Sequence, residues 1–300
     1  MKLSTITHPN VLALVLLEKY ASFFSDPLYL KIKYFIRMGK RLNLENPTTY
    51  NEKVQWLKLY GRTPETPTLC DKLAVKKIVA GKIGEEYVIP LLGSWTNPED
   101  IDFDALPNRF VLKCTHNSGL GMFVCKDKDK MDKAVVLEGL RQGLDQDFFL
   151  YSRDYCYKGI PHRIIAEEYR EDEKTGELRD YKFFCFDGEP KIFFIASGRS
   201  KGEENITFDF YDMDYNHLPF TNGHPNSKIP LEKPSCFEEM KKLAATLSQG
   251  MPHVRIDFYE ANGQVYFGEY TFSHWAGMVP FDPKEWDSKI GNWIKIPLKK

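Results

Sequence analysis

The stretch VRIDFYEANGQVYFGEYT, residues 254–271, decides how the rest of the chain is interpreted. Both halves are rich in aromatic and β-branched residues, and the intervening EANG at 260–263 is typical of a β-hairpin turn. Each half carries one central carboxylate, Asp257 in the first and Glu269 in the second. Ionised carboxylates are costly in apolar surroundings unless a cation or hydrogen-bond donors meet them. Two of them close together therefore predict a site for a hard cation.

The length of the turn determines whether the two carboxylates share a face of the hairpin. A two-residue Asn-Gly turn places Glu269 on the opposite face from Asp257. A three-residue turn, residues 261–263, places Asp257, Glu269 and Arg255 on one face, and we predict this turn. The alternative to a metal site is that Asp257 pairs with Arg255 or a distant lysine while Glu269 is merely half exposed.

Composition limits the classes of function. The length of 300 residues suits two or three lobes. The chain has 41 basic and 42 acidic residues and no dense basic stripe with interleaved aromatic residues, which argues against nucleic-acid binding. Six scattered cysteines without a Cys-x-x-Cys pair argue against a zinc module and a disulfide framework. They favour a reducing compartment.

Two N-terminal segments bear on localisation. The apolar run at 11–17 is too short to span a bilayer and lacks the flanks of a signal peptide. We therefore expect a soluble cytoplasmic protein. Residues 28–41 are basic and apolar together, which would allow peripheral contact with the inner face of a membrane or with a partner; the alternative is an ordinary surface helix. Nothing in the sequence predicts the oligomeric state.

The mixture of helical and strand patterns favours an α+β fold over a doubly wound sheet. Residues 1–60 are expected to be helical with breaks near Pro27 and Pro47, and TYNE at 49–52 resembles a capping box. A helix over 71–83 should end at Gly84. Strands are expected at 88–95, 109–114, 121–126, 163–169, 179–187, 190–199 and 206–212, with helices near 130–144 and 235–249.

A loop with two glycines, THNSGLG at 115–121, follows a strand, FVLKC at 110–114. Backbone N–H groups of such a loop can bind phosphate oxygens, and Lys113 would add a positive charge. The loop is neither a P-loop nor a Rossmann fingerprint, and by itself it is more typical of an ordinary hairpin. The strand IIAEEY at 164–169 ends in two acids that would border a nucleotide or simply face solvent. His116 and His274 lie in loops, where an isolated histidine is more often incidental than catalytic.

The order of these elements resembles the ATP-grasp superfamily, and more narrowly the TupA-like ATP-grasp proteins of cell-surface polysaccharide synthesis, some of which are labelled glycosyltransferases. The resemblance covers nearly the whole chain. It is carried by NLENPTTYNEKVQWLKLY at 43–60, DK at 71–72, residues 110–119, DYKF at 180–183 and RIDFY at 255–259. The implied ATP-grasp fold has two α+β lobes with mainly antiparallel sheets that grip a nucleotide. The chain would then consist of a helical N-terminal region (1–85), followed by the smaller lobe with the glycine loop (86–166) and the larger lobe with the Mg²⁺ site (167–300).

The resemblance also implies roles for individual residues. Contacts to ATP would come from Lys72, Lys113, Ser118, Gly119, Gly121, Glu167, Glu168 and Lys182. The metal ligands would be Asp257, Glu269 and Thr271, and the catalytic residues that stabilise the reacting phosphate would be Arg255 and Arg199. Thr271 stands where many ATP-grasp enzymes have Asn, and residues 273–277 depart from the Pro- and Gly-rich stretch expected there.

The implied activity is that of an ATP-dependent carboxylate–amine ligase that forms an acyl-phosphate, with ATP and Mg²⁺ as cofactors. The acceptor would be a small-molecule or glycan carboxylate, such as a sugar acid or a peptide, and the donor an amine or amino acid. Three alternatives stay open: a glycosyltransferase, for which Asp212-Met213-Asp214 spells an Asp-x-Asp motif; an ATP-dependent glycan kinase; and a nucleotide-binding scaffold without turnover.

Overall fold

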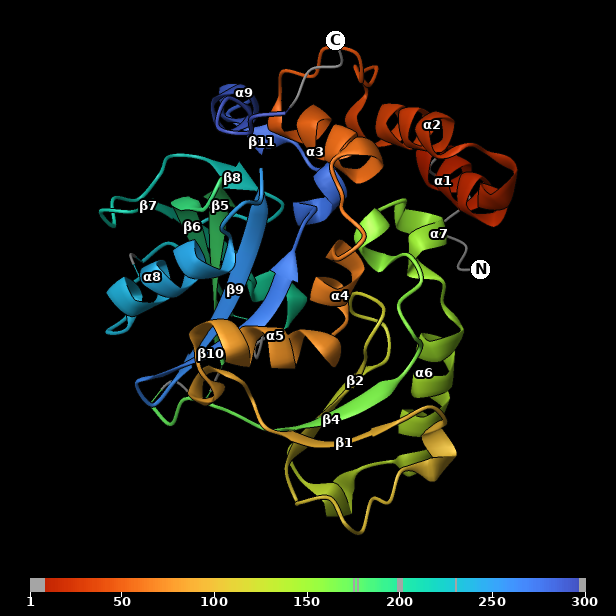
Figure 1. Ribbon diagram of the computed structural model, residues 1–300, viewed down its shortest axis with the longest axis vertical. Coiled ribbons are helices and arrows are strands. Elements are labelled where there is room, and N and C mark those ends of the chain that lie inside the picture. Colours follow the sequence, from red (N-terminus) through yellow and green to blue (C-terminus); the bar gives the residue numbers. More distant parts are fainter. Residues whose placement is uncertain (1–8, 175, 177, 199–201, 230, 297–300) are drawn as a thin grey trace.

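The computed structural model describes residues 9–174, 176, 178–198, 202–229 and 231–296. Helices and antiparallel sheets combine in an α+β architecture, as predicted (Figure 1). The helices are α1 (Pro9–Lys19), α2 (Asp26–Met38), α3 (Tyr50–Tyr60), α4 (Thr66–Cys70), α5 (Ala74–Ile83), α6 (Lys133–Asp145), α7 (Phe148–Ser152), α8 (Phe237–Leu247) and α9 (Glu285–Gly291). The strands are β1 (Leu91–Trp95), β2 (Phe110–Cys114), β3 (Met122–Cys125), β4 (Ile164–Glu168), β5 (Arg179–Phe186), β6 (Glu189–Ser197), β7 (Thr207–Asp212), β8 (Thr221–Asn222), β9 (Val254–Ala261), β10 (Gln264–Thr271) and β11 (Phe281–Asp282).

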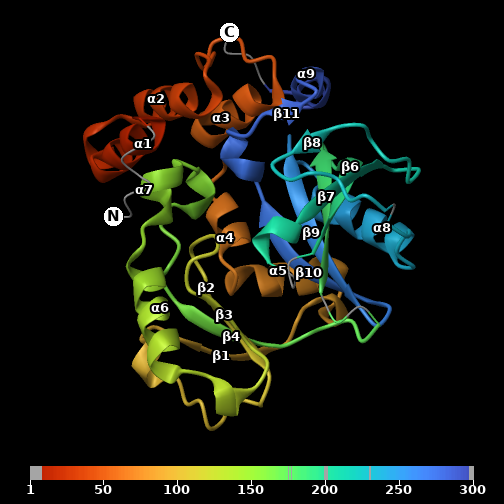
Figure 2. The ribbon, with the colours of Figure 1, turned by 180° about the vertical axis from the view of Figure 1, so that it is seen from behind.

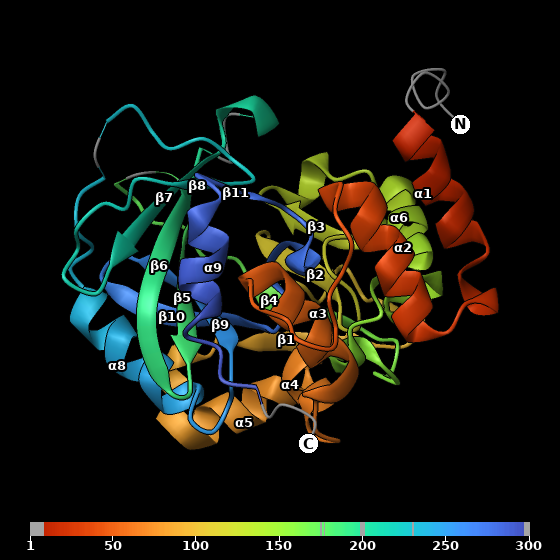
Figure 3. The same cartoon turned by 90° about the horizontal axis from the view of Figure 1, so that it is seen from above.

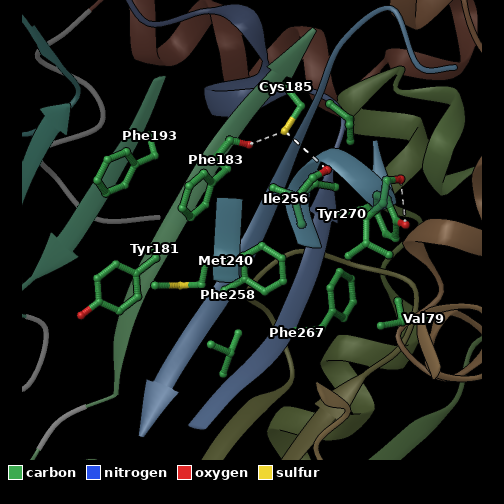
Figure 4. Close-up of a cluster of buried hydrophobic side chains, with 14 of the residues drawn as sticks. Val79, Tyr181, Phe183, Cys185, Phe193, Met240, Ile256, Phe258, Phe267 and Tyr270 are labelled. Carbon is green, nitrogen blue, oxygen red and sulfur yellow. Dashed lines mark hydrogen bonds between the residues drawn. The ribbon is translucent and has the colours of Figure 1, made fainter. Parts of the chain in front are cut away.

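The larger sheet has the strand order β10-β9-β5-β6-β7 and is buried on both faces. Because side chains alternate along a strand, the adjacent residues Phe183 and Phe184 enter different cores. Phe183 belongs to a core cluster that also contains residues of α5 and α8; in Figure 4, Met240 of α8 lies near Phe183, and Val79 of α5 lies at the far side of the cluster, beside Phe267. Phe184 packs with residues of α3 and α9. Truncating either ring to alanine would cost about 3–5 kcal/mol.

The smaller sheet has the order β1-β4-β2-β3 and is covered by α6 on one face. Leu112 of β2 and Ala166 of β4 belong to the apolar cluster under this helix. Lys113 and Glu167 are the next residues along these two strands, so they point to the other face. Alternation along β2 and β4 thus places a lysine and a glutamate together on the face that α6 leaves free.

Helices α1 and α2 form one end of the molecule, away from β6 and β7 (Figure 3). Helix α3 begins with the predicted capping box: the Thr49 hydroxyl accepts from the Glu52 amide, and the Glu52 carboxylate accepts from the Thr49 amide. Helix α7 lies near α1 and α2 in Figure 1 and Figure 2, and the Tyr29 hydroxyl of α2 donates to the Tyr151 carbonyl of α7.

The predicted strands coincide with β1 to β7 to within a few residues. The division of the chain near residues 85 and 166 stays a prediction.

All six cysteines are buried and free; the sequence argued against a disulfide framework from their scattered positions. Among the helices of the described residues, none is long and apolar enough to cross a membrane.

Candidate active site

The two carboxylates of the hairpin lie opposite each other across β9 and β10. The connection is the two-residue turn Asn262-Gly263, with both φ angles positive, so the predicted three-residue turn is wrong. A bulge at Gly268 shifts the register by one residue and pairs Glu269 with Asp257. A Cβ atom at Gly268 would lie 3.1 Å from the Asp257 carbonyl oxygen, which favours glycine there. The carboxylates therefore share a face, as predicted, but because of the bulge.

Asp257 is fully buried between two cations. Its Oδ1 accepts from Nε of Arg255 at 2.7 Å, and its Oδ2 accepts from Nη2 of Arg255 at 2.7 Å and from Nζ of Lys182 at 2.5 Å. Burial by itself would raise the pKa of Asp257, but the charges of Arg255 and Lys182 outweigh burial and lower it. Asp257 thus forms the ion pairs with an arginine and a lysine that were expected under the alternative to a metal site.

Glu269 is held more loosely. Its side chain is 41% exposed, with Nη2 of Arg255 at 3.6 Å and the Thr271 hydroxyl at 3.3 Å from Oε1. Carboxylate and hydroxyl oxygens suit Mg²⁺, which keeps several waters and takes further oxygens from phosphates. Glu269 and Thr271 fit such an ion as they stand, whereas Asp257 fits one only after Lys182 or Arg255 has turned away. Within the described residues, no three His, Cys, Asp or Glu side chains cluster as a metal site.

A second charged cluster lies on the smaller sheet. Glu167 is buried and accepts from Nζ of Lys113 at 2.6 Å and from Nζ of Lys76. Burial opposes ionisation of Glu167, but the two lysines lower its pKa to about 2. Sequence reasoning missed Lys76. It follows Lys72 by four residues, and in the helix expected over 71–83 this spacing places both lysines on the same face.

Lys72 connects the two clusters to the glycine loop. Its Nζ donates to the Asn117 carbonyl at 2.5 Å, and its amide donates to the Thr115 carbonyl at 3.2 Å. Burial lowers the pKa of Lys72, the charge of Glu269 opposes this effect, and the charge of Lys113 adds to it. Lys72 therefore lies within electrostatic range of both sheets.

The glycine loop approaches the helix that covers the smaller sheet. Gly119 and Gly121 have positive φ angles of 94° and 72°. A Cβ atom at Gly121 would also lie 2.5 Å from the Cys114 sulfur, so this position requires glycine for its backbone conformation and for its packing. The Asn117 side chain donates to the Gly143 carbonyl of α6 and fixes the start of the loop.

A cavity of about 600 Å³ opens beside Arg255 and Glu269. Ser118 of the glycine loop, Lys182 and Thr271 also line it, whereas the Lys113–Glu167 pair does not. Glu168 is half-buried and pairs with Arg170, and it does not line the cavity. The predicted Arg199 lies outside the described residues.

Polar side chains of the stretch at 43–60 hold a segment that forms part of the cavity wall. From α3, Asn51 donates to the Val279 carbonyl at 3.2 Å, and Gln55 donates to the Ala276 and Gly277 carbonyls at 2.8 and 2.9 Å. These contacts hold a segment in which Trp275 and Ala276 both have positive φ angles, a conformation that costs free energy without such support. Residues 43–60 therefore shape the stretch at 273–279 that departs from the expected pattern.

The architecture is thus a pair of antiparallel sheets, one with a lysine and a glycine loop and the other with a carboxylate hairpin, which is the arrangement of the ATP-grasp proteins. A family model described as TupA-like ATPgrasp matches residues 52–295, and the chain belongs to this family. The predicted family and fold are therefore confirmed.

Several solved structures show a partial likeness. D-alanine–D-alanine ligase from Bacillus anthracis, complexed with ATP, has a TM-score of 0.39 and 16% identity over 68% of this chain and 54% of its own. The ATP-grasp ligase PsnB, complexed with a minimal precursor, has a TM-score of 0.41 and 10% identity over 70% and 54%. D-cycloserine synthetase DcsG has a TM-score of 0.39 and 14% identity over 70% and 64%. The chain thus spans about half to two thirds of these proteins. A comparison with curated proteins found no match.

Proposed function

We propose that the protein is an ATP-dependent carboxylate–amine ligase that joins an amine or amino acid to a sugar acid or peptide through an acyl-phosphate. Membership of the TupA-like family supports a place in the synthesis of a cell-surface polysaccharide. The observation that carries the proposal is the position of Lys72, which contacts the glycine loop and lies in the electrostatic field of both Lys113 and Glu269. Lys72 and Lys113 do not line the cavity beside Glu269, so the triphosphate would have to extend from that cavity toward the smaller sheet to meet all three groups.

The chain's residues would act mainly by positioning and by neutralising charge, because phosphoryl transfer needs little covalent help from a protein. Lys72 and Lys113 would bind phosphate oxygens, and the backbone of Ser118 to Gly121 would close over them. Mg²⁺, when bound through Glu269 and Thr271, and through Asp257 once Lys182 has turned away, would neutralise phosphate oxygens. Arg255, held by Asp257, would stabilise the charge of the transferring group beside the cavity.

The substrate carboxylate would attack the γ-phosphate, giving an acyl-phosphate and ADP. The amine would then displace phosphate and form the amide. The glycosyltransferase alternative lacks support from Asp212, because its Oδ1 accepts from the amides of Asp214 and Asn216 and closes a turn after β7. This Asp-x-Asp spelling therefore belongs to a turn that does not line the cavity.

Trapping with hydroxylamine tests the proposal. Hydroxylamine replaces the amine and converts an acyl-phosphate into a stable hydroxamate. With ATP·Mg and a panel of sugar acids and peptides, we expect hydroxamate together with ADP. Formation of a phosphate ester on a hydroxyl, without hydroxamate, would instead identify a glycan kinase, and release of a nucleoside diphosphate only from a nucleotide sugar would identify a glycosyltransferase.

We also propose that the protein works in the cytoplasm, in contact with the inner face of an anionic membrane. Large apolar side chains are exposed on α1 and α2 and between them, including Leu16, Leu28, Phe35 and, at 83% exposure, Phe23. Residues 9–41 carry six basic side chains (Lys19, Lys31, Lys33, Arg37, Lys40, Arg41) against two acidic ones (Glu18, Asp26), while the whole chain has a net charge of −1. Apolar and basic surface together favour anionic lipid.

Vesicle flotation tests this contact. The protein should float with vesicles that contain phosphatidylglycerol and less with neutral vesicles. Phe23→Asp should abolish flotation, whereas Ile229→Asp, a matched change at an exposed apolar residue far along the chain, should not. Equal recovery of both variants with the anionic vesicles would contradict the proposal.

A further inference from the structure

The cavity beside Arg255 has an excess of positive charge on the wall that the N-terminal helices supply. Lys33 and Arg37 of α2 and Lys58 of α3 line it, in addition to Lys182 and Arg255 from the larger sheet. The acids in the lining are Asp154 and Glu269. Lys33 and Arg37 lie before residues 52–295, so they are outside the part of the chain that the family model matches.

These cations differ in how far the protein neutralises them. Lys182 and Arg255 share Asp257, and Lys33 donates to Glu18 at 2.8 Å. Lys58 is 2% exposed, and within the described residues its Nζ donates only to main-chain oxygens, those of Ala276 at 2.8 Å and Ser152 at 3.4 Å. An ammonium group has three N–H donors, so one remains for a ligand. Arg37 is exposed and forms no ion pair within the described part of the chain.

A buried ammonium without a carboxylate partner is costly. Burial lowers the pKa of Lys58 to about 8; Asp154 opposes this effect, and Lys33 and Arg62 add to it. Asp154 is shared by two cations: its Oδ1 lies 3.5 Å from Nε of Arg62 and accepts from the Cys156 amide, and it acts on Lys58 only through its electrostatic field, without an ion pair between the two among the described residues. An anion in the cavity would supply the charge that Lys58 lacks.

We propose that Lys58 and Arg37 bind a second anionic group of the acceptor, a carboxylate or a phosphate. This inference rests on the proposed ligase function. The acceptor is then at least a dianion, with one carboxylate activated beside Arg255 and the other anionic group held by α2 and α3. The N-terminal helices thereby select the substrate, and neutral or singly charged sugars bind weakly.

Three open-chain sugar acids test this assignment, because they differ only at the end away from the first carboxylate. D-Gluconate carries one carboxylate, D-glucarate carries two, and 6-phosphogluconate carries a carboxylate and a phosphate. Binding is measured by calorimetry without nucleotide, so that it does not depend on ATP turnover. We expect glucarate, 6-phosphogluconate or both to bind about tenfold more tightly than gluconate. Which one does so distinguishes a carboxylate from a phosphate.

Lys58→Met and Arg37→Gln should each reduce this preference to about twofold. Arg37 is exposed, so its variant should fold even if the buried substitution does not. Lys31→Gln removes an equal charge from an exposed position of α2 that does not line the cavity, and it should keep the wild-type preference. Equal affinity for the three acids, binding of none of them, or a preference that survives in both cavity variants would overturn the assignment. Stabilisation by ATP·Mg is independent of these results and would leave the proposed function in place.

Discussion

The guanidinium of Arg255 donates from Nη1 to Nδ1 of His274 at 2.5 Å. Because an arginine carries no acceptor, Nδ1 must be the unprotonated nitrogen, and Nε2–H then donates to Oδ1 of Asn222 at 2.9 Å. Burial and then the charge of Arg255 hold the pKa of His274 well below its usual range, so the ring stays neutral. His274 is therefore a positioning residue for Arg255. Sequence reasoning treated His274 as an incidental loop histidine.

Replacing His274 by alanine should lower kcat about 10- to 100-fold while leaving the KM for ATP nearly unchanged. The reason is that Arg255 keeps its bonds to Asp257 but loses the contact that fixes its other nitrogen. Steady-state kinetics measure this split. His217→Ala, at an exposed position outside the cavity, is the control. A KM that rises with an unaltered kcat would show that His274 serves nucleotide binding instead.

The two predicted metal ligands should behave differently when their charge is removed. Among the described residues, Asp257→Asn leaves the buried Arg255 with only the Glu269 carboxylate at 3.6 Å, while Lys182 keeps Asp180 at 3.1 Å. The free energy of unfolding should therefore fall by about 2–3 kcal/mol. Glu269→Gln changes a half-exposed side chain and should alter it by less than about 0.5 kcal/mol, yet Mg²⁺-dependent ATP turnover should be lost. Urea unfolding and ADP release measure the two effects. Full turnover in Glu269→Gln would remove Glu269 from the metal site.

Acid should destabilise the protein through buried histidines. Burial lowers the pKa of His253 to about 3, and burial with the charge of His162 lowers that of His116 to about 4, against 6.5 for a free histidine. Below pH 6.5 the unfolded chain therefore binds protons that the native protein does not. The free energy of unfolding then decreases as the pH is lowered, by up to about 1.4 kcal/mol per pH unit for each group.

Urea unfolding between pH 7.5 and 5 measures this slope. His253→Gln should reduce it, even though the loss of the bonds from His253 to Tyr50 and the Cys185 carbonyl will lower stability at every pH. A free energy of unfolding that is constant across this range in the wild-type protein would contradict the prediction.

Local patterns were sufficient to predict most of the fold. The capping box at Thr49 and the alternation along β2 and β4 depend on neighbouring residues, so they can be read without knowledge of the tertiary structure. The bulge at Gly268 could not be predicted in this way, because one extra residue in a strand does not produce a repeating pattern that can be recognised in the sequence. It nevertheless decides which face Glu269 occupies.

The site was predictable only where one element carries the pattern. Asp257 and Glu269 lie on a single hairpin, and Lys113 is the penultimate residue of the strand before the glycine loop. Lys58 and Arg37 come from helices far from the hairpin in sequence, and only the folded chain brings them to the same cavity. Their long-range placement explains why a sequence pattern could not reveal a cationic wall.

Thermal unfolding of the wild-type protein with ATP·Mg, ATP with EDTA, UDP-glucose or buffer alone tests the central claim most directly, since a ligand that binds only the native state raises its apparent stability. If the glycine loop, Lys72 and Glu269 form one nucleotide site, ATP·Mg will raise the midpoint more than ATP with EDTA does, and Glu269→Gln will remove that difference. Stabilisation by UDP-glucose but not by ATP·Mg would contradict the account.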